Sequence, residues 1–148
     1  MELLHLEDAL NELGKEIILQ ITKELKDSGH TDTGDTISSL KYRLDMTSDP
    51  VILNIVSNDT LRYIDSGRRP GKQPPAGPLG DWAERKGIKI GKNKKSAGFV
   101  IAHSIGKKGI HPTDIIDKAI DQAIQNKSNL FSDALADDIW DSIKNTFE

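Results

Sequence analysis

The chain has 148 residues, of which 36% are apolar and 5% aromatic, and it contains no cysteine. This length suits one domain with one modest core, and the lack of cysteine excludes disulfide scaffolds, thiol nucleophiles and thiolate metal sites. No apolar run approaches the ~20 residues that cross a bilayer, and acidic residues interrupt the first apolar ones, so we expect no membrane contact and no secretory leader. We therefore treat residues 1–148 as a single domain.

The net charge of −3 conceals a strong contrast along the chain. Residues 1–61 carry 5 basic and 12 acidic side chains, residues 62–108 carry 12 basic and 3 acidic ones, and residues 109–148 carry 3 basic and 8 acidic ones. A basic middle between acidic ends either binds an external polyanion or complements the acidic parts of a neighbouring copy. The sequence leaves both interpretations open.

Residues 1–28 predict a long N-terminal helix. Apolar residues recur every three or four positions and form one stripe: Leu3, Leu6, Leu10, Leu13, Ile17, Ile21 and Leu25. At roughly 1.5 Å per residue the helix is about 40 Å long, which is long for a domain of this size. The stripe packs either wholly on the chain's own core or, through Leu3, Leu6 and Leu10, partly against another subunit.

Two short segments next predict a β-hairpin. Leu40, Tyr42 and Leu44 alternate with charged residues, and β-branched residues fill much of 51–58 beyond a polar turn at 47–50. Two strands alone are unstable in water. We therefore expect the hairpin to lie on helices, to join a wider antiparallel sheet, or to pair with another chain.

The remainder predicts a Pro/Gly-rich basic loop followed by about four short helices. Residues 67–80 contain four glycines and four prolines, which excludes most of this stretch from helix or strand interiors. The expected helices begin at Pro78, at a Ser96 cap, at a Thr113 cap, and at residue 130 after a break over 126–129. The buried side of the helix after Ser96 is expected to consist of Phe99, Val100, Ala102 and Ile105. Together with the hairpin, this order of elements predicts an α+β fold.

No pattern of catalytic or ligand-binding residues is present. The histidines are scattered without ligand spacing, and neither a phosphate-binding loop nor a GxSxG nucleophile motif occurs. Asp137, Asp138 and Asp141 are expected to form the solvated face of the last helix rather than a metal site. We therefore expect no enzymatic activity and no cofactor; a hydrolase or nuclease would need a metal or nucleophile site that the sequence does not supply.

The basic segment 62–108 raises the question of nucleic acid. Twelve cations in this segment could contact phosphates, but its aromatic residues, Tyr63, Trp82 and Phe99, are few and have packing explanations. No sequence-reading motif is evident. Sequence-independent DNA contact therefore stays open as an alternative function, with Lys92, Lys94 and Lys95 facing DNA or the lumen of a ring.

A series of motifs in the middle of the chain points to a known family. In order they are Thr33-Gly34-Asp35-Thr36-Ile37-Ser38-Ser39-Leu40, Tyr63-Ile64-Asp65-Ser66-Gly67-Arg68-Arg69-Pro70-Gly71, Pro74-Pro75, Trp82 to Ile88, and Ala97 to Pro112. In this order and spacing they resemble the neck or tail-completion proteins of long-tailed bacteriophages, the family that includes the minor tail protein Z of phage lambda. The family-like core covers 33–112, while the flanking helices, 1–28 and 113–148, match only by type. Family members usually continue with Pro-Phe, where this chain has Pro112-Thr113.

The resemblance implies a structural virion protein without enzymatic activity. Such proteins form rings, commonly six-fold, at the head-proximal end of the tail and enable head–tail joining. The implied partners are further copies of the chain, a tail-tube or tail-terminator protein, and head–tail connector or adaptor proteins. The implied location is the neck or upper tail of the virion, assembled in the host bacterial cytoplasm.

Specific roles are predicted for two sets of residues in the family-like core. Arg68, Arg69 and Lys72 are predicted to lie at a subunit or partner interface, with a solvated basic loop as the alternative. A second set is predicted to fix the shape of the loop: Gly67, Pro70, Gly71, Pro74, Pro75 and Trp82.

Overall fold

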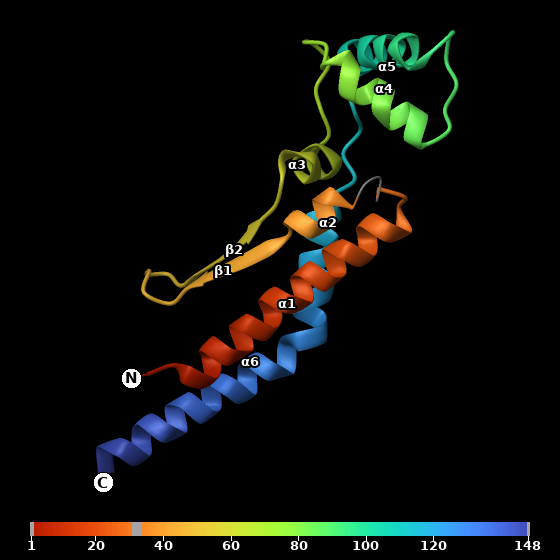
Figure 1. The fold of residues 1–148 in the computed structure, drawn as a ribbon. Helices are drawn as coiled ribbons and strands as arrows, with labels where there is room; N and C mark the ends of the chain where they lie inside the picture. Colours follow the sequence, from red (N-terminus) through yellow and green to blue (C-terminus); the bar gives the residue numbers. More distant parts are fainter. Residues whose placement is uncertain (1, 31–33, 148) are drawn as a thin grey trace.

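Helices dominate the fold and one small antiparallel sheet completes it, as Figure 1 shows for the computed structural model, which describes residues 2–30 and 34–147. The elements are α1 (Leu4–Asp27), α2 (Asp35–Ser39), β1 (Lys41–Asp45), β2 (Ile52–Val56), α3 (Asp59–Ser66), α4 (Ala76–Arg85), α5 (Lys94–Lys108) and α6 (Ile115–Phe147). The predicted α+β class, long N-terminal helix and hairpin are confirmed. Thr33, the first residue of the family-like motifs, lies outside the described residues.

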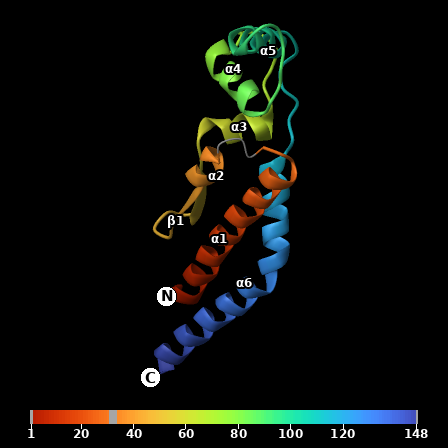
Figure 2. The ribbon, with the colours of Figure 1, turned by 45° about the vertical axis from the view of Figure 1, so that its right-hand side comes forward.

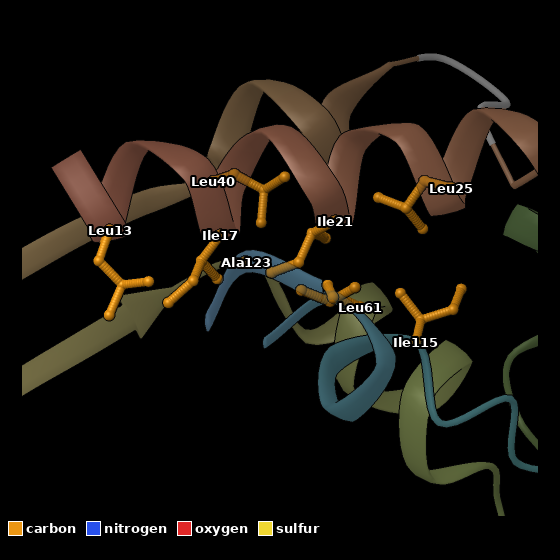
Figure 3. Packing of buried hydrophobic residues seen from close by; sticks show 9 residues of the cluster. Leu13, Ile17, Ile21, Leu25, Leu40, Leu61, Ile115 and Ala123 are labelled. Atoms are coloured by element: carbon orange, nitrogen blue, oxygen red, sulfur yellow. The ribbon is translucent and has the colours of Figure 1, made fainter. Parts of the chain in front are cut away.

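The body of the molecule is an antiparallel pair of long helices, α1 and α6, which lie side by side in Figures 1 and 2. The stripe predicted for the first helix is buried from its middle to its end, at Leu13, Ile17, Ile21 and Leu25. From α6, Ile115, Ala119 and Ala123 join the same buried cluster (Figure 3). The two alanines allow the helix backbones to approach closely, so the large side chains of α1 lose nearly all contact with water.

One continuous helix replaces the two that were predicted after residue 113. α6 extends over 33 residues and passes through the expected break at 126–129. Asn126 does not end the helix because its side chain is bonded elsewhere: it donates to Glu16 Oε1 of α1 at 2.9 Å and accepts from Gln122 at 2.8 Å. An asparagine breaks a helix by bonding to nearby backbone. Here a partner on the other helix removes that competition.

The hairpin lies on α1. This is one of the three arrangements expected for it, because two strands alone are unstable in water. Tyr42 of β1 pairs with Ile55 of β2. The Tyr42 ring covers Gly14 of α1, where an added Cβ would come within 2.5 Å of a ring carbon, and its hydroxyl donates to Asn11 Oδ1 at 3.2 Å. Leu53 and Ile55 pack against the buried cluster. Gly14 thus allows the sheet to sit directly on the helix.

Two short helices, α2 and α3, were not predicted from the sequence. α3 is held by Leu61, which is 1% exposed in the buried cluster. Its end also fixes the start of α6: Asp65 Oδ1 accepts from the Ile116 amide at 2.9 Å. The predicted cap, Thr113, instead donates its hydroxyl proton to the Ile64 carbonyl oxygen at 2.6 Å. A carboxylate from another helix therefore caps α6, in a position that complements its dipole.

Helices α4 and α5 pack on each other as a separate lobe at one end of the molecule (Figure 1). They cross at Gly80 and Gly98, where a Cβ on either glycine would collide with the backbone of the other helix. This close approach makes the small-residue face the buried one. The predicted buried side is therefore correct for Ala102, which is fully buried, and wrong for Phe99 and Val100, whose exposed fractions are 61% and 47%.

The predicted helix starts in this lobe also need correction. α4 begins at Ala76, two residues before Pro78, with Pro75 as its N-cap residue. α5 is capped by Asn93, whose Oδ1 accepts from the Ser96 amide at 3.0 Å, so Ser96 is the capped residue rather than the cap. Asparagine and serine are both good caps, and only the backbone conformation distinguishes which one is used.

The two chain segments that connect the lobe to the body are bonded to each other. The Arg68 amide donates to the Ile110 carbonyl oxygen at 2.9 Å, and the Ile110 amide donates back at 2.8 Å. Gly67 and Gly109 flank this bridge with φ values of 72° and 73°, and a Cβ on either would collide with the opposite segment. We call this paired connection, residues 67–71 with 106–112, the clasp. Only glycine fits at both positions.

Replacing Gly67 with alanine should open the clasp. The substitution adds backbone strain and a collision with residues 110–112, so we expect the free energy of unfolding to fall by about 2 kcal/mol or more. Gly29→Ala is the matched control, because Gly29 also has a positive φ but has no atom within 4 Å of the added Cβ. Urea unfolding followed by circular dichroism measures both, and equal losses would contradict the role of the clasp.

The far end of the helix pair is fixed by a buried carboxylate. Asp138 of α6 is 2% exposed, and its two oxygens accept from the His5 and Leu6 amides of α1 at 3.0 and 2.8 Å. The expectation that Asp138 is solvated was therefore wrong. Its side chain satisfies two amides at the N-terminus of α1 and places a negative charge at the positive end of the helix dipole.

Asp138→Ala should loosen this end of the pair. It leaves two amides of α1 without their acceptor, so we expect a loss of about 1–3 kcal/mol in the free energy of unfolding. Asp137→Ala is the control, since Asp137 is exposed and a surface change of this kind shifts stability by less than about 0.5 kcal/mol. A similar stability for both variants in thermal or urea unfolding would show that the cap is unimportant.

Candidate functional site

A large groove lies between the α4–α5 lobe and the body. Its volume is about 750 Å³, and it is lined by the segment that follows α1, by α2 and α3, by α4 and α5, and by residues 110, 111 and 113. Its large apolar and aromatic side chains are Ile37, Tyr63, Ile64, Leu79, Trp82, Ile101, Ile105 and Ile110. Pockets of this volume with mostly apolar walls are typical binding sites. We call this feature the lobe groove.

The rim of the lobe groove is basic on the side of α4. Arg85 and Lys86, at the end of this helix, both line it, and His30 and His111 line it as well. Trp82 lies on α4, as expected, and lines the groove, while its predicted role in fixing the preceding loop stays a prediction. Sequence reasoning missed Ile101 and Ile105 as groove residues. Their spacing of four on one face of α5 was the available signal.

The three basic residues of the loop, Arg68, Arg69 and Lys72, differ in their contacts. The Arg68 guanidinium donates to the Lys72 carbonyl oxygen at 2.9 Å, and its carbon lies 5.6 Å from the centre of the Tyr63 ring. This cation–π contact turns Arg68 inward as a brace for the loop. Arg69 and Lys72 are exposed, so their side chains are accessible to a partner. Their predicted interface role stays a prediction.

The residues predicted to shape the loop mostly lie in or beside the clasp. Gly67 is required there by its conformation, and the Gly71 amide donates to the Gly106 carbonyl oxygen at 2.7 Å. Pro70 lies against Gly109. Pro74 is half-buried and Pro75 is the N-cap residue of α4. The loop therefore connects the clasp to the first helix of the lobe.

The three lysines predicted to face DNA or a ring lumen lie together at the start of α5 and in the loop before it. Lys92 and Lys95 are exposed. Lys94 differs, because its ammonium lies 3.1 Å from Asp81 Oδ1 and 3.6 Å from Glu84 Oε2 of α4. The hydrogen bond to Asp81 raises the pKa of Lys94, with charge attraction to both carboxylates adding to it. Its charge is thus already partly compensated within the lobe.

The opposite end of the molecule exposes a second apolar surface. The last part of α6 carries four large side chains with exposed fractions between 43% and 59%: Leu135, Ile139, Trp140 and Ile143. We call these four residues the α6 stripe. Leu3, Leu6 and Leu10, the predicted interface residues of α1, are half-buried at this same end of the helix pair. Sequence reasoning did not single out Trp140.

An ion pair links the two helices beside the α6 stripe. His5 Nε2 lies 3.1 Å from Asp141 Oδ2. The hydrogen bond to Asp141 raises the pKa of His5; desolvation opposes this, and the charges of Asp138, Asp141 and Asp137 add to the rise. A raised histidine pKa favours the folded state below the unfolded value of about 6.5, and this contribution is lost as the pH rises through the folded value.

The titration of His5 tests this geometry. In an NMR pH titration we expect the His5 midpoint to lie above about 6.5, the value for an unperturbed histidine. Asp141→Asn should return it toward that value, because the charged hydrogen-bond acceptor is lost. Asp133→Asn, on the same helix, provides the control. An unshifted midpoint in the unmodified protein would contradict the ion pair.

The described residues contain neither a metal-binding cluster nor a membrane-spanning helix. Among residues 2–30 and 34–147, no group of three or more histidine or acidic side chains is placed to hold a metal ion. Within the same described ranges, no helix is sufficiently long and apolar to cross a membrane. The lobe groove and the α6 stripe are therefore the surfaces on which we base the functional argument.

Comparison with known proteins gave no match: no family model, curated protein or solved structure proved similar to this chain.

Proposed function

We propose that this chain is a structural virion protein that forms a ring at the head-proximal end of a long phage tail, where it completes the tail and enables head–tail joining. The observation that carries the proposal is the ordered series of motifs over 33–112. Three of these motifs contain residues that make contacts described above. Gly67 lies in the clasp, Trp82 lines the lobe groove, and Gly98 lies where α4 and α5 cross.

The shape of the molecule supports an assembly role. It is elongated, with the lobe at one end and both termini at the other (Figures 1 and 2). Each end presents apolar surface, the lobe groove or the α6 stripe, in a chain whose core is small. Contiguous exposed apolar surface of this kind is typical of proteins that bind other proteins.

The proposed partners follow from the same role. They are further copies of the chain in a ring, six-fold by preference, a tail-tube or tail-terminator protein, and the head–tail connector or adaptor proteins. The proposed location is the neck or upper tail of the virion, after assembly in the bacterial cytoplasm. The proposed role is structural and includes no enzymatic activity.

The mass of the purified protein in solution tests this proposal. Native mass spectrometry or mass photometry would be run on the chain alone and with its cognate tail-tube protein. We expect an oligomer of about six copies, alone or on the tube end, since ring proteins of this kind close by point-group symmetry. A strict monomer under both conditions would contradict the proposal.

Sequence-independent DNA binding is the second candidate, and the exposed lysines at the start of α5 favour it. It predicts that DNA slows the migration of the isolated protein at low salt, with an affinity that falls steeply as salt rises. The double change Lys92→Ala and Lys95→Ala should weaken such binding, while Lys23→Ala on α1 serves as control. Unchanged mobility at low salt would exclude this candidate.

A further inference from the structure

The α6 stripe is an apolar face that its own chain leaves uncovered. Its exposed fractions are 43% at Leu135, 44% at Ile139, 59% at Trp140 and 44% at Ile143. Leu135, Ile139 and Ile143 recur every four residues and Trp140 lies three residues before Ile143, so the four share one side of the helix. Asp133 and Asp137 lie on the adjacent side, and residues 130–147 carry four aspartates and one lysine in total. The surface is thus apolar with an acidic flank.

The lobe groove offers the complementary surface. It is concave and mostly apolar, with Leu79, Trp82 and Ile105 among its walls and Lys86 on its rim. Among the described residues, its charged lining residues carry a net positive charge and are Arg85, Lys86 and Asp35. An amphipathic helix with an apolar stripe and an acidic flank is the occupant that such a groove suits, because apolar contact and charge attraction then coincide.

The two surfaces lie at opposite ends of the molecule, so one copy cannot bring them together (Figure 1). We propose that the α6 stripe of one copy docks in the lobe groove of a second copy. This is a head-to-tail contact between two different surfaces, and such contacts repeat from copy to copy until the rotation closes a ring. The inference rests on the proposed function, for which it supplies the contact between neighbouring subunits.

Two variants block one surface each. Ile143→Asp places a charge on the α6 stripe, and Ile110→Asp places one on the wall of the groove at a side chain that is 39% exposed. We expect each variant alone to be monomeric where the unmodified protein is oligomeric, with an affinity at least about tenfold weaker. Lys86→Glu reverses a rim charge without touching apolar packing and should weaken assembly in a salt-dependent manner.

Mixing the two blocked variants gives the sharpest test. The Ile143→Asp variant keeps its groove and the Ile110→Asp variant keeps its stripe, so an equimolar mixture should form a 1:1 dimer that grows no further. Leu19→Asp is the matched control, since Leu19 is 59% exposed on α1 outside both surfaces and its change should leave assembly unaffected. Circular dichroism of each variant verifies that the helices are retained.

Each other result would overturn the contact in a recognisable way. Oligomers that persist in either blocked variant would place the subunit contact elsewhere while leaving the proposed ring intact. A mixture that stays monomeric would contradict head-to-tail pairing, and dimers of Ile110→Asp alone would indicate a stripe-to-stripe contact. An unmodified protein that is monomeric alone would also overturn this contact, whereas a ring formed on the tail tube would still support the proposed function.

Discussion

The antiparallel packing of α1 against α6 is the interaction on which the rest of the structure depends. The buried cluster holds one end of the pair, and the Asp138 carboxylate, bonded to the first amides of α1, holds the other. The hairpin rests on α1 through Tyr42 and Gly14. α3 caps the start of α6 through Asp65. The hairpin and α3 are thus each held against one of the two long helices.

The lobe is held together and attached to the body by contacts of a different kind. α4 and α5 pack mainly on each other through small residues, and the clasp connects them to the body through backbone hydrogen bonds. Trp82 of α4 and Ile105 of α5 line the groove beside this contact. Close backbone packing at Gly80 and Gly98 holds the two helices of the lobe together.

Local patterns predicted the elements whose partners are local or periodic. The α1 stripe and the alternation at Tyr42 and Leu44 were sufficient for the first helix and the hairpin. The errors arose where a distant residue decides the outcome: Glu16 keeps α6 continuous by bonding Asn126, and Gly80 selects the buried face of α5. The basic loop could be recognised from composition. The lobe groove could not, because it exists only through the placement of the lobe against the body.

If copies meet with the end of α6 in the lobe groove, as we propose, the chain's two tryptophans report on the contact, since Trp140 lies on the stripe and Trp82 in the groove. Trp82→Phe and Trp140→Phe each leave a single reporter, whose emission and quenching by acrylamide can be followed as the protein concentration is raised. The account predicts that both reporters shift to shorter wavelength and become protected together as oligomers form. Oligomers in which Trp140 stays as accessible as in the monomer would contradict it.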